Sequence, residues 1–196
     1  MNRQLAFISF AAACILTACA REEAATQTPA PADVAAARAA ANDLGARLKT
    51  RLLDALATGG PVAAIEVCNL EAPKIATVLS GETHMSVGRT ALRWRNPANA
   101  PDDFERAAME DFRSQIVGGA DPAMLERAEI VTTPQGRQLR YMKPIMTGGP
   151  CTLCHGTDVS DEVKAAILAR YPDDQATGFA LGEFRGAFSI TKDLEG

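Results

Sequence analysis

The chain is poor in aromatic side chains and has no excess of basic ones. Its 196 residues include one Trp and two Tyr, and 24 acidic residues outnumber 20 basic ones, which gives a formal net charge of −4. Proteins that bind nucleic acids use a basic surface, often with aromatic side chains on which bases stack. The composition therefore argues against nucleic acid as a partner.

The sequence also lacks an apolar run long enough to cross a bilayer as a helix, which takes about 20 residues. The short apolar segment 5–16 follows Arg3, which is the order found in a signal peptide. Residues 16–19 read Leu-Thr-Ala-Cys and resemble a bacterial lipobox. We expect cleavage after residue 18 and lipidation of Cys19. Cleavage of an ordinary signal peptide nearby is the alternative.

The expected lipid anchor places the protein on the periplasmic side of a bacterial membrane. Ala20 follows the cysteine, where Asp often marks retention in the inner membrane, so the outer membrane is favoured. Residues 19–32 are rich in Glu, Thr, Gln, Pro and Ala and indicate a flexible tether. The remaining residues, 33–196, suit one compact domain.

Helical and strand-like segments alternate along this domain, which predicts an α+β fold with an antiparallel sheet and helices around it. Leu44, Leu48 and Leu52 recur at helical spacing and predict a long first helix from Asp33 to the Gly59-Gly60 pair. Other expected helices cover residues 61–79 (kinked or divided at Pro73), 102–116 and 161–171. Expected strands cover residues 85–94, 129–133, 137–145 and 179–190, the last as one long strand or a pair.

The chemistry is concentrated in Cys151-Thr152-Leu153-Cys154-His155. Cys-x-x-Cys-His is the spacing of c-type haem attachment, in which two thiols add to the vinyl groups of haem and the histidine ligates the iron. The chain has only five Cys and two His, so a chance match is rare. Gly156 follows and keeps a side chain away from the porphyrin. We predict one covalent haem c.

Three other interpretations of the motif remain open. A redox-active Cys-x-x-Cys would need a strand before it and a helix starting at the first cysteine, whereas Gly148-Gly149-Pro150 precedes Cys151. A zinc site would need a fourth ligand, for which Cys68 or His84 could serve. The two motif cysteines could also form a disulfide.

The ligand on the other side of the iron is less determined. The sulfur candidates are Cys68, Met85, Met142 and Met146, and the nitrogen candidate is His84. Each also has an ordinary interpretation, since a cysteine on an apolar helix face and a methionine on a strand usually pack in the core. Spacing alone does not separate them.

Several segments besides the haem motif resemble a known family, the periplasmic or sensor-associated haem domain with a PAS-like fold and a single c-type haem. The resemblance covers about residues 35–192. It rests on residues 64–68 with 72–73, residues 87–90 running to 95–97, residues 99–102, and residues 141–145 leading to 151–156. The Arg-Asn-Pro-x-Asn segment at 95–99 together with the haem motif is its most specific part.

The resemblance implies a PAS-like central sheet with a long N-terminal helix packed outside it. It matches Cys68 to the distal axial ligand, opposite His155. Haem propionates need cationic partners, and arginine suits a carboxylate. The family motif favours Arg89 and Arg95 for that role, and Trp94 could pack on the porphyrin.

The predicted function is single-electron transfer to a redox partner protein. The alternative is a haem-based redox or gas sensor that signals to a partner protein. An enzyme is not expected, because the sequence shows no distal acid–base pair and no second haem motif. Contact with the membrane is expected through the lipid anchor alone.

Overall fold

The computed structural model describes residues 28–194, so the expected signal peptide 1–18, Cys19 and most of the tether lie outside the described residues. The helices are α1 (Pro31–Glu66), the π-helix η1 (Val67–Glu71), α2 (Ala72–Thr83), α3 (Asp103–Val117), α4 (Thr152–His155) and α5 (Asp161–Leu168), with short 3-10 turns η2 (Pro97–Asn99), η3 (Pro122–Met124) and η4 (Gly149–Cys151). The strands are β1 (Ser86–Thr90), β2 (Arg127–Thr133), β3 (Gly136–Met146) and β4 (Phe184–Leu194). The predicted α+β class is confirmed. Within the described range, no helix combines the length and apolar character that crossing a bilayer requires.

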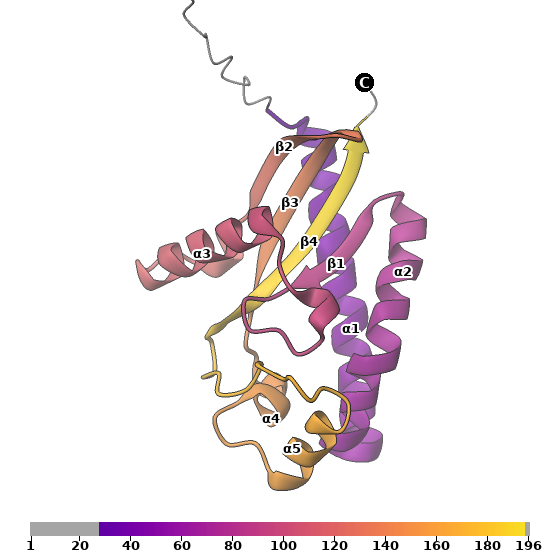
Figure 1. Cartoon of the computed structure of the whole chain (residues 1–196), viewed down its shortest axis with the longest axis vertical. Helices are drawn as coiled ribbons and strands as arrows, with labels where there is room; N and C mark the ends of the chain where they lie inside the picture. The colour runs from indigo at the N-terminus through magenta and orange to yellow at the C-terminus, as the bar shows by residue number, and fades with distance from the viewer. Residues whose placement is uncertain (1–27, 195–196) are drawn as a thin grey trace, which may run out of the picture.

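The four strands form one antiparallel sheet in the order β1-β4-β3-β2 (Figure 1). A two-residue turn at 134–135 joins β2 to β3, as the predicted hairpin requires. The last strand is a single one and lies inside the sheet, but it begins at Phe184 and not at 179. The first strand ends at Thr90, where the chain leaves the sheet and the Ala91 amide donates to the Asn99 carbonyl at 3.2 Å.

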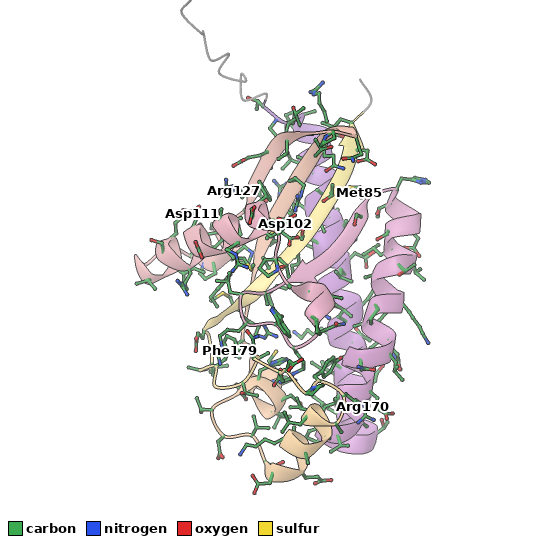
Figure 2. All side chains as sticks on the ribbon, in the orientation of Figure 1. Met85, Asp102, Asp111, Arg127, Arg170 and Phe179 are labelled. Atoms are coloured by element: carbon green, nitrogen blue, oxygen red, sulfur yellow. The ribbon has the colours of Figure 1, made fainter. Side chains whose placement is uncertain are left out.

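Helices cover both faces of the sheet. Side chains alternate between the faces along each strand, so Leu139, Tyr141 and Ile190 pack against α1. Met142 and Ala187 point the other way and pack against α3. A capping box stabilises the start of α3, which Figure 2 labels at Asp102. The sheet and α1 thus form a rigid support whose lower end in Figure 1 meets α4 and α5.

The first helix breaks where the sequence predicted. Gly60 has non-helical backbone angles, with a φ of +69° that suits glycine, so α1 consists of two helical segments joined by a kink. The predicted helix end at Gly59-Gly60 and the predicted helix start at Pro61 are therefore confirmed. Next come the five residues of η1, and Pro73 lies in the first turn of α2, where its missing N–H costs nothing. The helix therefore changes from α to π geometry at Val67, before the kink or division that we predicted at Pro73.

Candidate functional site

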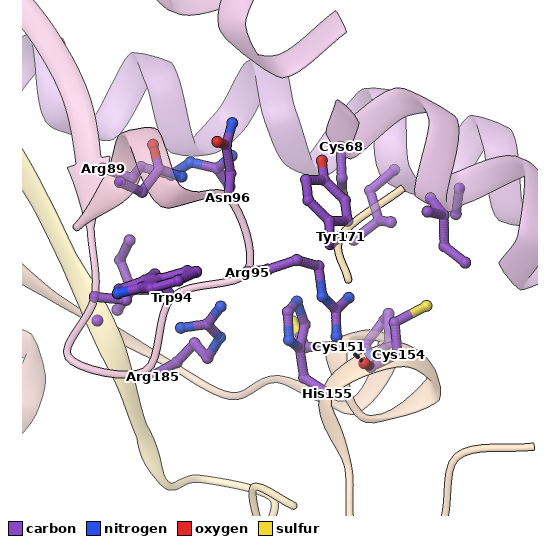
Figure 3. A pocket seen from close by; sticks show the side chains of 18 of the residues that line it. Cys68, Arg89, Trp94, Arg95, Asn96, Cys151, Cys154, His155, Tyr171 and Arg185 are labelled. Carbon is purple, nitrogen blue, oxygen red and sulfur yellow. Dashed lines mark hydrogen bonds between the residues drawn. The ribbon is translucent and has the colours of Figure 1, made fainter. Parts of the chain in front are cut away.

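A cavity lies between the lower half of α1, η1, the loop after β1, the ends of β3 and β4, and the Cys-x-x-Cys-His segment (Figure 3). It holds about 1100 Å³ of empty space, including its open mouth. Leu52, Leu56 and Ile65 give it an apolar wall. Binding sites for organic cofactors have this character, with apolar walls and few polar groups.

His155 ends α4 and lines this cavity. Its Nδ1 is 2.6 Å from the Ala176 carbonyl oxygen, so Nδ1 carries the proton and donates it in this hydrogen bond. That leaves Nε2 with a free lone pair. Burial, reinforced by the positive charges of Arg185 and Arg95, holds the pKa of His155 well below its ordinary value. A neutral imidazole with one fixed tautomer is the form that ligates a metal.

The backbone after His155 is fixed by close packing and hydrogen bonds. A β-carbon on Gly156 would come within 2.4 Å of the Thr152 carbonyl oxygen, so only glycine fits there. The Phe179 amide donates to the His155 carbonyl at 2.9 Å, and the Gly178 amide donates to the Gly156 carbonyl at 2.8 Å. Figure 2 shows Phe179 beside the segment that carries α4. The loop 174–179 therefore holds the motif in place.

Cys151 and Cys154 both line the cavity, and both are free thiols. Burial raises the pKa of the Cys154 thiol, and Arg95 opposes that effect in part. The disulfide interpretation would require a bond between these two cysteines, and no such bond is present in residues 28–194. Within the described residues, no group of three or more His, Cys, Asp or Glu side chains is placed to hold a metal ion.

Cys68 lies in the π-helix η1 and lines the same cavity. In the view of Figure 3 it lies above the cavity and His155 lies below it. Short π-helical insertions occur often at functional sites, because they turn one side chain out of the regular helical pattern. Cys68 is thus placed on a different wall from the motif.

The other distal candidates fall into two groups. His84 is exposed at the left-handed end of α2, with φ of +54°, and does not line the cavity. Met85 and Met142 are buried in the packed clusters on the two faces of the sheet. Met146, at the end of β3, does line the cavity. The structure therefore leaves two sulfur candidates, Cys68 and Met146.

Arg95 lines the cavity but is largely committed to protein partners. It forms a buried ion pair with Asp174, with Nε and Oδ1 2.9 Å apart. One terminal nitrogen also donates to the Cys154 carbonyl at 2.6 Å and to the Ala176 carbonyl at 3.3 Å. The Cys154 carbonyl belongs to the peptide bond that precedes His155, and the Ala176 oxygen also accepts from His155. Arg95 therefore positions His155. Its predicted contact with a propionate stays a prediction.

Asp174→Asn is expected to destabilise the protein by about 3–5 kcal/mol, because it leaves the Arg95 charge buried without a partner. The asparagine oxygen can still accept from the Ala176 amide, which donates to Asp174 at 3.1 Å in the native chain. Urea unfolding measures the change, and Asp173→Asn, at an exposed neighbouring position, is the control. Equal unfolding midpoints in the two variants would contradict a structural role for the ion pair.

Three cavity residues were missed in the sequence: Arg185 and Tyr171, which line it, and Asp174, which holds Arg95. Arg185 gave a weak signal, since it lies between Phe184 and the short apolar run Gly186-Ala187-Phe188. Gly186 is tightly packed, since a β-carbon there would meet the Thr90 carbonyl oxygen at 2.5 Å. Asp174 gave no signal in the sequence, because it lies 79 positions from its partner Arg95.

Comparison with known proteins agrees with this fold. The sequence model of the Tll0287-like family matches residues 15–192. Among solved structures, the chain is similar to the crystal structure of the cyanobacterial heme-protein Tll0287, with a TM-score of 0.65 and 20% identity over 85% of this chain and 98% of that one. No curated protein sequence matches the chain. Because the family match covers nearly all of the sequence, this chain belongs to the Tll0287-like family.

Proposed function

We propose that the chain is an exported haem protein that carries one c-type haem and transfers single electrons to a partner protein. One observation carries the proposal: a partly buried, neutral His155 with a free Nε2 lines a cavity together with the two free thiols of its own motif, Cys151 and Cys154. Family membership and the name of the cyanobacterial heme-protein support a haem cofactor.

The residues of the cavity fit a haem. The apolar wall from α1 suits the porphyrin plane, and Trp94 adds an aromatic surface. The Nε atom of Arg185 is buried without a hydrogen-bond partner, which is what a missing anionic ligand would leave behind. Haem carries both features, an apolar plane and two carboxylates.

The two thiols supply the covalent attachment. Each S–H adds across a vinyl C=C bond, so a C–S bond forms, the proton goes to the neighbouring vinyl carbon, and no external oxidant is needed. With haem bound, the iron would supply the reversible one-electron chemistry. Because Cys151 lies in η4 and Cys154 in α4, the short helical turn that separates them also sets the position of His155.

Cys68 is our proposed ligand on the opposite side of the iron. A thiolate donates electron density and stabilises ferric iron, so a His/Cys pair implies a low reduction potential. The same proposal includes a PAS-like assignment of the sheet and helices, the lipid anchor on Cys19 and the periplasmic location. They are consistent with a redox protein held at a membrane surface.

Optical spectra of the oxidised and the reduced protein, with and without carbon monoxide, test the proposed function. An electron carrier is expected to show reversible spectra that the gas does not change, because both axial positions stay occupied. A large spectral shift of the reduced protein with carbon monoxide would favour the haem sensor instead. Turnover of peroxide with a reducing co-substrate would contradict the proposal that the protein is not an enzyme.

A further inference from the structure

The cavity is positively charged and its charge is not balanced. Three of its lining residues are arginines, Arg89, Arg95 and Arg185, whereas none of the described residues that line it is Asp or Glu. Asp174 pairs with Arg95 from behind the lining. Neither Arg89 nor Arg185 takes part in an ion pair within residues 28–194. Two guanidinium groups are therefore left without a counter-ion.

Arg185 extends from β4 and has only part of its hydrogen-bonding capacity used. One terminal nitrogen donates to the Arg93 carbonyl at 3.1 Å, and the guanidinium lies 5.1 Å from the centre of the Phe179 ring. Its Nε is buried with no partner. Burial, together with the nearby charges of Arg95 and Arg89, lowers the pKa of Arg185 to about 10. This group is charged, poorly solvated and turned toward an opening large enough for a ligand.

Arg89 extends from β1 into the same cavity. Burial lowers its pKa, and the thiol of Cys68 and the phenol of Tyr171 are the titratable groups that oppose this effect. A partly buried charge without a partner has lost part of its hydration, and an anion that binds it offsets that loss. Two such charges in one cavity indicate a ligand with two negative groups.

In the view of Figure 3 the Trp94 ring lies between the side chains of Arg89 and Arg185. Separated cations suit two carboxylates on flexible arms better than one compact anion. The geometry points to Arg89 and Arg185 as the residues that hold the two propionates of the haem, one each, while Arg95 positions His155. This inference rests on the proposed function and adds Arg185 as a residue that binds the cofactor.

The test uses the haem-loaded protein with the haem carboxyl carbons labelled with carbon-13, through labelled aminolaevulinate in the growth medium. Arg89→Met and Arg185→Met remove the charge and keep a long side chain. Arg106→Met, at an exposed position on α3, is the control for the same change in net charge. Infrared difference spectra between labelled and unlabelled protein then report the haem carboxylates alone, free of protein Asp and Glu.

Each cavity variant is expected to shift one of the two labelled carboxylate bands and to lower the reduction potential, because a cation near the haem stabilises the reduced form. Arg185→Lys should restore most of both effects, and Arg106→Met should produce neither. Labelled bands that stay in place in both Met variants would overturn the assignment even if the potential moved. If Arg89→Met changed the spin state of the haem and left the labelled bands unmoved, Arg89 would act on the Cys68 ligand and not on a propionate. That result would overturn the half of the inference that concerns Arg89. A wild-type protein without haem would refute the proposed function itself.

Discussion

A chain in which Cys151 and Cys154 are both replaced by alanine is expected to contain no covalent haem. The two cysteines are the free thiols that precede His155 in the adjoining turns η4 and α4, and no other described thiol lies in this segment. Haem staining after denaturing electrophoresis measures the result, because only covalently bound haem stays with the polypeptide. The expected loss is complete.

The matched control for this variant is Cys68→Ala, which removes the third described cysteine of the cavity and is expected to keep its haem-stained band. The single variants Cys151→Ala and Cys154→Ala should each retain one thioether bond and a weaker band. A full band in the double variant would show that attachment does not use this motif, and the proposed cofactor type would then be wrong.

Cys68→Ala is expected to change the spin state of the attached haem and to raise its reduction potential by an amount on the order of 0.1 V, within the range of about 0.8 V that axial ligands span. The physical reason is the loss of a thiolate that stabilises ferric iron. Absorption spectra and electron paramagnetic resonance report the ligation, and a redox titration reports the potential. The thioether bonds do not involve Cys68, so haem content should not change.

Met146→Leu is the comparison that decides between the two sulfur candidates, since both side chains line the cavity. We expect spectra and a reduction potential close to those of the wild type, because leucine conserves the volume and apolar character of methionine. If Met146→Leu altered the spectra while Cys68→Ala left them unchanged, Met146 would be the ligand and Cys68 a packing residue.

Much of the fold followed from local sequence patterns. The hairpin of β2 and β3, the start of α3 at Asp102 and the long first helix all depend on neighbours within a few positions, such as a two-residue turn or a capping box. The Gly59-Gly60 pair predicted a helix end, and Gly60 does interrupt α1 there, because glycine tolerates its positive φ.

The site could be predicted only in part. The haem motif is contiguous, so its residues were identifiable from spacing alone. The pairing of Arg95 with Asp174 and the position of Arg185 depend on contacts between segments about 80 or more residues apart, for which one sequence gives no periodic signal. His84 and Met85 were eliminated as ligands only when α2 and the sheet placed them away from the cavity.

We propose above all that Cys151 and Cys154 carry one haem through covalent bonds. The most direct test is the intact mass of the denatured wild-type chain, produced in cells that contain the machinery for c-type haem attachment. We expect a mass equal to that of the processed polypeptide plus one haem, and a haem-bearing peptide that contains Cys151 to His155. A mass equal to that of the polypeptide alone, from protein that was red before denaturation, would contradict it.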